Sequence, residues 1–129
     1  MPDASQMTAL VVDDQVSMRA LVRQGLQQIG FGEVRDAGDG EDGLRALVAK
    51  PATLVISDFN MPKLDGLGFL RAVRSYEPTS KIAFIMLTGR ADRDLVARAV
   101  QFGVNNYLVK PFTVATLKEK IEAIFGPLA

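Results

Sequence analysis

Residues 54–66, LVISDFNMPKLDG, run from a short apolar stretch directly into a carboxylate, Asp58. The opening LVIS does not alternate in polarity, which is typical of a parallel strand covered on both faces. A charge at the tip of such a strand is costly unless it has a partner or a task, because burial removes its hydration. The Asn-Met-Pro run at 60–62 then favours a turn. The segment therefore predicts a buried strand that ends on a functional carboxylate.

Four more segments are rich in strand-forming residues, and helical patterns separate them. Strands are expected at residues 8–12, 33–37, 54–57, 82–87 and 107–109. Helices are expected along the stripe Met18, Leu21, Val22, Gly25 and Ile29, at 40–48, at 66–76, at 95–102 with Gly103 as the cap, and at 114–125. This β-α order, repeated five times with short connections, predicts a doubly wound α/β fold with a five-stranded parallel sheet and helices on both faces.

The composition limits the possible functions. The 129 residues suit one domain, and 15 Lys and Arg balance 15 Asp and Glu, so no net field attracts nucleic acid or membranes. The sequence has no Cys and no His, which excludes disulfides, thiolate nucleophiles and zinc sites built on these residues. The first residues lack the layout of a signal peptide, and no apolar run approaches the roughly 20 residues of a membrane span. We therefore expect a cytoplasmic protein without a nucleic-acid partner or membrane insertion.

Polar residues follow four of the expected strands. In doubly wound sheets, ligands bind beyond the carboxyl ends of the strands, near the switch in strand order. The residues at these ends are Asp13, Asp14, Asp58, Thr88 and Lys110. Crowded carboxylates without His or Cys favour a hard cation, and Mg²⁺ in particular takes one or two carboxylates and leaves positions for phosphate oxygens. With Lys110 and Thr88 as donors to that phosphate, an Asp here can act as a nucleophile and form an aspartyl phosphate.

Each of these residues also has a simpler interpretation. Asp13, Asp14 or Thr88 alone would most often cap a helix, and Lys110 alone would be a solvated strand end. Asn60 alone would be a turn residue. Their joint occurrence, with one polar group or pair at each of four strand ends, favours a common site.

Four motifs together resemble the receiver domain of bacterial two-component signalling: VVDD at 11–14, ISDFNMPKLDG at 56–66, LTG at 87–89 and VKPF at 109–112. The resemblance covers essentially the whole chain and is strongest to the stand-alone chemotaxis regulators of the CheY type. It implies a flavodoxin-like (βα)5 fold with strand order 2-1-3-4-5. It also implies a single receiver domain over residues 1–129 with no output domain, acting as a monomer.

The resemblance implies a role for each acidic residue. Asp58 matches the phosphoacceptor, which a partner histidine kinase phosphorylates in a Mg²⁺-dependent reaction. Asp14, Asp58 and the backbone carbonyl of Asn60 match the direct Mg²⁺ ligands, and Asp13 acts through water.

The resemblance also assigns the lysine and the switch residues. Lys110 matches the lysine that contacts the phosphoryl group, and its bond to Pro111 is expected to be cis. Thr88 matches the switch hydroxyl and Tyr107 the switch aromatic, although Tyr107 alone would be interpreted as packing. In the family, these two residues rearrange on phosphorylation and reshape the face of the fourth helix, fifth strand and fifth helix. That face then binds a partner such as a flagellar motor switch protein.

Two other protein classes share the fold or the nucleophile. A haloacid-dehalogenase-like phosphatase also uses a strand-end Asp with Mg²⁺, but it places a second Asp two residues on as general acid, where this sequence has Asn60. A flavodoxin-like binding module would have a phosphate loop rich in Gly, Ser or Thr after the first strand. Here residues 13–19 read DDQVSMR and carry two negative charges. We therefore expect a phosphoacceptor domain in preference to a conventional enzyme.

Three arginines, Arg90, Arg93 and Arg98, form a basic stripe on the expected fourth helix. Such a stripe is most often a solvated helix face, and the alternative is a docking site for an acidic partner or an anionic ligand.

Overall fold

The computed structural model describes residues 1–89 and 93–129. Its elements are β1 (Thr8–Val12), α1 (Val16–Ile29), β2 (Glu33–Ala37), α2 (Gly40–Ala49), β3 (Leu54–Asp58), α3 (Gly66–Ser75), β4 (Ala83–Thr88), α4 (Arg93–Gln101), β5 (Asn106–Val109) and α5 (Val114–Phe125), with short 3-10 turns η1 (Ala4–Gln6) and η2 (Glu77–Thr79). Every strand and helix expected from the sequence is present in this described part. None of the helices in it is long and apolar enough to cross a membrane.

The strands form one parallel sheet in the order β2-β1-β3-β4-β5, which confirms the expected strand order. From β1 the chain moves outward to the edge strand β2, and then crosses back to β3 on the other side of β1. The switch in strand order therefore lies between β1 and β3, where a doubly wound sheet places its ligand site.

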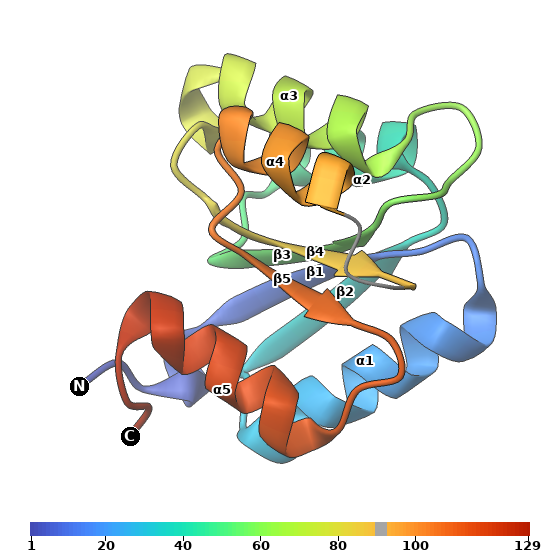
Figure 1. Ribbon diagram of the computed structural model, residues 1–129. Helices are drawn as coiled ribbons and strands as arrows, with labels where there is room; N and C mark the ends of the chain where they lie inside the picture. Colours follow the sequence, from blue (N-terminus) through green and yellow to red (C-terminus); the bar gives the residue numbers. More distant parts are fainter. Residues whose placement is uncertain (90–92) are drawn as a thin grey trace.

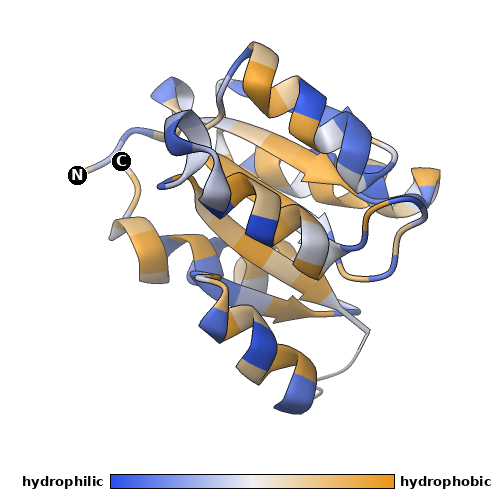
Figure 2. Cartoon of the chain, turned by 90° about the horizontal axis from the view of Figure 1, so that it is seen from above, coloured by the Kyte–Doolittle hydropathy of each residue, from blue (hydrophilic) through white to orange (hydrophobic). Residues whose placement is uncertain are grey.

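Helices cover both faces of the sheet (Figure 1). α1 and α5 pack on one face, and α2, α3 and α4 pack on the other. Alternate residues of the central strands point to opposite faces, so Val11 and Ile56 belong to the core beneath α1 and α5, whereas Leu10 and Val55 belong to the other core. The apolar band through the central strands and the polar outer helix faces are visible in Figure 2.

Two details differ from the sequence expectation. Strands β3 and β4 extend one residue further, so that Asp58 and Thr88 belong to the sheet instead of following it. Leu21 of the predicted core stripe is 54% exposed. The buried residues of α1 are Val22, Gly25 and Leu26, so its core face includes Leu26, which the predicted stripe left out, and excludes Leu21. Helix α5 packs closely on this face, since a Cβ at Gly25 would lie 3.0 Å from Leu117 Cδ2.

Two glycines fix the ends of helices. Gly103, in the left-handed region at φ +90°, ends α4 as expected: its N–H bonds Val100 O (3.0 Å), and Val104 N–H bonds Ala99 O (2.9 Å), as in a Schellman motif. Gly66 opens α3 directly against the end of β3, where a Cβ would lie 2.5 Å from the carbonyl oxygen of Asp58. A glycine there lets the α3 helix begin beside the strand end that carries Asp58.

Candidate functional site

Three carboxylates meet at the carboxyl end of the sheet, beside the switch in strand order. Asp13 and Asp14 follow β1, and Asp58 is the last residue of β3. Because β1 and β3 are paired neighbours, their carboxyl ends lie side by side. One oxygen from each of the three carboxylates lies within 4.8 Å of the others. The structure thus brings together three residues that the sequence predicted to share a site.

Asp13 is fully buried and is held by its backbone and one carboxylate oxygen. Its N–H donates to Ala37 O of β2 (3.2 Å), and its Oδ1 accepts from Gln15 N–H (2.9 Å). Its Oδ2 is buried without a hydrogen-bond partner among the described residues. Burial raises the pKa of Asp13; the Gln15 N–H opposes this effect, and the charge of Asp58 adds to it. A cation or a water at Oδ2 would stabilise the ionised form.

The capping interpretation of the acidic pair is wrong for α1. The residue at the N-cap is Gln15, and its side chain makes no capping hydrogen bond. Asp14 is exposed, so the pair presents one buried and one solvent-facing carboxylate to the site.

Lys110, which directly follows β5, adds a positive charge to the three carboxylates. Its Nζ lies 2.9 Å from Asp58 Oδ1 and 3.7 Å from Asp13 Oδ2, and only 19% of its side chain is exposed. Its backbone N–H donates to Thr88 O (2.7 Å), and its bond to Pro111 is cis, as expected. Lys110 is therefore not a solvated strand end; it is an ammonium ion that faces two of the three carboxylates.

Thr88 ends β4 at the same edge of the sheet. Its side chain is buried, and within the described structure its Oγ1 has no hydrogen-bond partner. A buried hydroxyl left unpaired costs stability. Thr88 thus offers an uncommitted donor close to Lys110, with which it shares a backbone hydrogen bond.

Asn60 and Tyr107 make none of the contacts given above for the acidic cluster. Asn60 is exposed, two residues beyond Asp58. Tyr107 is half-buried in β5 against the core under α2, α3 and α4, with Lys120 Nζ 5.0 Å from its ring centroid. Neither position tests the role that the resemblance implied, so both roles stay predictions.

The expected basic stripe is only partly described, because Arg90 lies outside the described residues. Arg93 and Arg98 are exposed on α4. Arg93 and Tyr107 both line a cavity of about 350 Å³ between α4 and β5. Binding of a partner by the stripe stays a prediction.

One contact at this end of the sheet was not anticipated from the sequence. Arg19 of α1 donates from Nη1 to the backbone carbonyl of Asp13 (2.6 Å) and from Nε to Asp36 Oδ2 (3.3 Å). Arg19 and Arg23 occupy equivalent helical positions one turn apart, so the sequence pattern does not distinguish them.

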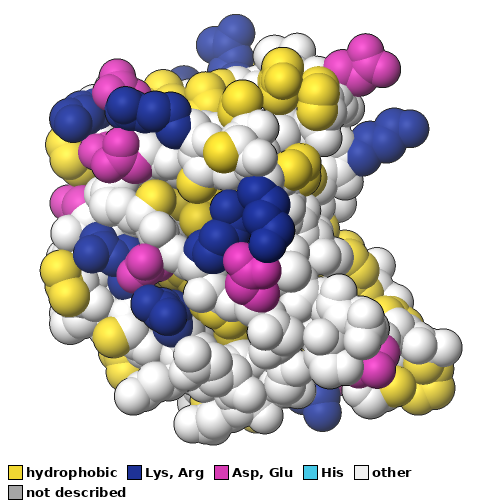
Figure 3. Space-filling view, turned by 180° about the vertical axis from the view of Figure 1, so that it is seen from behind, with side chains coloured by type: hydrophobic (Ala, Val, Ile, Leu, Met, Phe, Trp, Pro, Cys, Tyr) yellow, Lys and Arg dark blue, Asp and Glu magenta, His cyan; other side chains and the backbone are white. Residues whose placement is uncertain are grey.

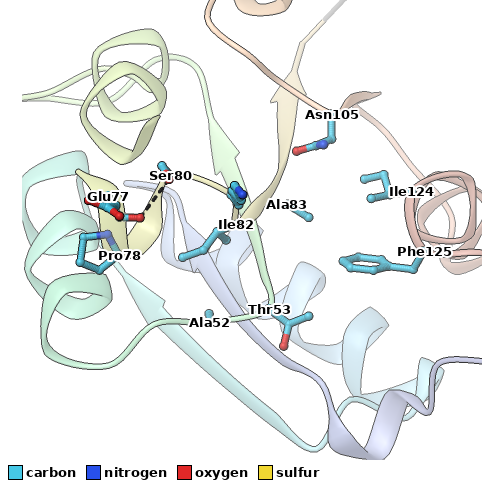
Figure 4. A pocket seen from close by; sticks show the side chains of 11 residues that line it. Ala52, Thr53, Glu77, Pro78, Ser80, Ile82, Ala83, Asn105, Ile124 and Phe125 are labelled. Atoms are coloured by element: carbon cyan, nitrogen blue, oxygen red, sulfur yellow. Dashed lines mark hydrogen bonds between the residues drawn. The ribbon is translucent and has the colours of Figure 1, made fainter. Parts of the chain in front are cut away.

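A different cavity, of about 680 Å³, lies at the amino end of the sheet (Figure 4). Side chains from η2, from the start of β4 and from the end of α5 line it. Three of its polar side chains are used within the fold: Thr53 Oγ1 accepts from Thr8 N–H (3.1 Å), Asn105 Oδ1 accepts from Phe84 N–H (2.8 Å), and Ser80 Oγ donates to Glu77 O (2.9 Å). It is therefore a weaker candidate for a functional site than the acidic cluster.

The donors at the carboxyl end fit a hard divalent cation. They are carboxylate oxygens from Asp13, Asp14 and Asp58, and the chain contains no His or Cys. The unpartnered Oδ2 of Asp13 is consistent with a cation or its bound water beside it. Oxygen donors of this kind suit Mg²⁺ better than zinc or copper.

The fold and the site together define a class: a doubly wound α/β domain with an acidic cation site and a lysine at its switch point. The chain matches the response regulator receiver domain over residues 9–122. It belongs to this family, as the sequence motifs indicated, and is a receiver domain of the CheY-like type. This is not a classical enzyme family, and the match favours it over the phosphatase and flavodoxin-like alternatives.

Relatives from several bacteria support the assignment. A probable chemotaxis protein CheY of Rhizobium etli is 54% identical over 125 residues, which are 97% of this chain and 97% of the relative. Among solved structures, chemotaxis protein CheY4 of Vibrio cholerae has a TM-score of 0.86 at 32% identity, covering 92% of this chain and 98% of that chain. A receiver domain of a sensor histidine kinase of Pseudomonas aeruginosa has a TM-score of 0.84 at 26% identity, and the match covers 94% of this chain and 98% of that chain. It was solved with a magnesium ion coordinated in its active-site cleft.

Proposed function

We propose that the protein is a phosphorylation-controlled signalling switch in which Asp58 accepts a phosphoryl group from a histidine kinase. CheY-like receiver domains take phosphate from such kinases and act on downstream targets. The observation that carries the proposal for this chain is the contact of Lys110 Nζ with Asp58 Oδ1 (2.9 Å) inside a cluster of three carboxylates. A phosphoryl group on Asp58 would meet this ammonium as a ready counter-charge.

In the proposed reaction, an oxygen of the Asp58 carboxylate attacks the phosphorus of the donor. An O–P bond forms, and the N–P bond to the kinase histidine breaks. The imidazole leaves with the electron pair and takes up a proton. The product is an acyl phosphate on Asp58, which water later hydrolyses to the carboxylate and inorganic phosphate. Lys110 neutralises charge on the transferring group throughout.

The same residues would hold the cation. We assign Asp14, Asp58 and the backbone carbonyl of Asn60 as direct Mg²⁺ ligands, and Asp13 as a ligand through water. Bound Mg²⁺ would offset the repulsion between the carboxylates and the incoming phosphoryl oxygens. The magnesium ion in the similar receiver domain from Pseudomonas aeruginosa supports this assignment.

Thr88 and Tyr107 are proposed to convert phosphorylation into a change of surface. The Thr88 hydroxyl is buried without a partner in the described residues, so a phosphoryl group on Asp58 would give it one. Tyr107 borders the cavity beside Arg93 on α4, so an inward turn of its ring would reshape the α4-β5-α5 face. Phosphorylation then shifts an existing equilibrium between two states by its contacts in one of them.

The proposed setting is control of chemotaxis and motility in the cytoplasm. The high identity to a probable chemotaxis protein supports it. The downstream partner in this setting is a flagellar motor switch protein, with the receiver domain acting alone as a monomer.

Incubation with acetyl phosphate and Mg²⁺, followed by intact mass spectrometry, tests the proposal. The protein should gain one phosphoryl group, and Asp58→Asn should gain none. Asp65→Asn is the matched control, because Asp65 is an exposed carboxylate at the start of α3 and Asn also caps helices well. Phosphorylation of Asp58→Asn to the level of the control would refute the assignment.

A further inference from the structure

We infer that Arg19 is a positioning residue for the acidic cluster: its guanidinium holds the backbone of Asp13, so that the two carboxylates after β1 face Asp58. The inference deepens the proposed function and rests on it, because the cluster matters through the cation and the phosphoryl group. Arg19 itself is assigned no contact with either.

The carbonyl of Asp13 needs a donor from outside the helix. It precedes the N-cap, Gln15, and the first turn of α1 is closed by Arg19 N–H donating to Gln15 O (3.0 Å). Arg19 Nη1 supplies the donor to the Asp13 carbonyl at 2.6 Å. A hydrogen bond from a charged donor to a partly buried acceptor is among the stronger ones in proteins.

Asp36 fixes the direction from which Arg19 reaches the turn. Its Oδ2 accepts from Arg19 Nε (3.3 Å), and the next residue of β2, Ala37, accepts the N–H of Asp13. The end of β2 therefore stabilises the position of Asp13 in two ways: Ala37 bonds it directly, and Asp36 acts through Arg19. The N–H and the carbonyl of Asp13 are thus both held. Its Oδ1 accepts from Gln15 N–H, and its Oδ2 faces Lys110.

The ion pair between Arg19 and Asp36 would not by itself indicate a role for Arg19 at the acidic cluster. Oppositely charged side chains lie beside one another on the face shown in Figure 3, and exposed pairs contribute little to stability. Arg23 illustrates the point: its Nη1 lies 3.6 Å from Asp36 Oδ2, but in the described structure it does not share the bond to Asp13. Arg19 is also more buried, with 19% of its side chain exposed against 40% for Arg23.

The guanidinium of Arg19 is suited to this task because two of its nitrogens engage two different acceptors. Lysine would keep the charge but has one compact ammonium on a flexible stem, without the planar fork. Arg19→Lys therefore keeps the positive charge and removes the planar guanidinium. Arg23→Met removes a second arginine that pairs with Asp36 but leaves the bond from Arg19 to Asp13 in place.

The test is a Mg²⁺ titration by calorimetry of the full chain, with amide hydrogen exchange of the metal-free protein as a second readout. Arg19→Met and Arg19→Lys should each weaken Mg²⁺ affinity about tenfold, the lower range seen when a group that orients metal ligands is removed. Arg23→Met should stay within about twofold of wild type. Without metal, exchange at the Gln15 amide should be faster in both Arg19 variants and unchanged in Arg23→Met.

The outcomes separate the inference from the proposed function. Wild-type affinity and exchange in a folded Arg19→Met would overturn the positioning role. If Arg23→Met lost as much Mg²⁺ affinity as Arg19→Met, the cause would be the lost positive charge and not the bond to Asp13. Wild-type Mg²⁺ affinity and Gln15 exchange in Arg19→Lys would mean the same. Either result overturns the inference. If the wild-type protein binds no Mg²⁺, the proposed site fails, and exchange at Gln15 alone then decides the positioning role. Arg19→Lys serves for both readouts if Arg19→Met does not fold.

Discussion

At the amino end of the sheet, the guanidinium of Arg74 donates to three backbone carbonyls and to Asn105 Oδ1. At the carboxyl end, in the described residues, Asp13 Oδ2 and Thr88 Oγ1 are buried without hydrogen-bond partners. One further atom of this kind, Arg35 Nε, lies in an ion pair with Glu33 Oε1 (3.6 Å). Because unpaired buried groups cost stability, the carboxyl end retains groups that suit a ligand, whereas the amino end uses its polar groups to hold the fold.

The largest expected effect is at the amino end. Arg74→Ala should lower the free energy of unfolding by about 3 kcal/mol, because it removes the donor to four acceptors, of which the carbonyls of Ser80 and Ile82 are partly buried. Arg71→Ala is the control: Arg71 is exposed and contacts the ring of Phe102 (5.0 Å to the centroid), so its loss should cost about 1 kcal/mol or less. Urea denaturation measures both. An equal effect of the two variants, or weaker Mg²⁺ binding in Arg74→Ala, would contradict the division between the two ends.

Two buried threonines give a sharper form of the comparison. Thr79, at the amino end, bonds Val73 O (2.7 Å) and Tyr76 O (3.1 Å) through its hydroxyl, whereas Thr88 has no such partner in the described structure. Thr88→Val should raise the free energy of unfolding of the metal-free protein by about 1 kcal/mol, and Thr79→Val should lower it by about as much. Thermal or urea unfolding of the two variants decides this, and changes of the same sign would count against it.

A single effect of similar size is expected for Asp39, a carboxylate at the carboxyl end whose hydrogen bonding is satisfied. Asp39, the N-cap of α2, accepts from Asp42 N–H (2.8 Å), and this bond, with help from Lys63, lowers the pKa of Asp39 below its ordinary value of 3.8. Asp39→Ala should cost about 1 kcal/mol of stability at neutral pH.

The sign of the pH dependence follows from the lowered pKa. The stabilisation by ionised Asp39 is present above pH 3.8 and is lost as the pH falls through the folded-state pKa. Urea unfolding across this range should therefore show the gap between wild type and Asp39→Ala closing in acid. A gap that stays constant would show that the charge of Asp39 does not contribute.

The sequence predicted the fold and most of the site because both depend on local signals. Apolar runs defined the strands, and the residues at their carboxyl ends, Asp13, Asp58 and Lys110, had to converge in a doubly wound sheet. The exposure of Leu21 was missed, because which side of α1 faces the core depends on its packing in three dimensions, and that side consists of Val22, Gly25 and Leu26. Arg19 was missed for a similar reason: its partners Asp13 and Asp36 lie on other elements, and nothing in the local pattern separates it from Arg23.

Trapping the phosphorylated residue tests the central claim most directly. After treatment with acetyl phosphate and Mg²⁺, borohydride reduces an aspartyl phosphate to homoserine, which peptide mass spectrometry can locate. The proposed function predicts homoserine at position 58, and none in Asp58→Asn. Reduction at Asp13 or Asp14, or no reduced residue in the wild-type protein, would contradict it.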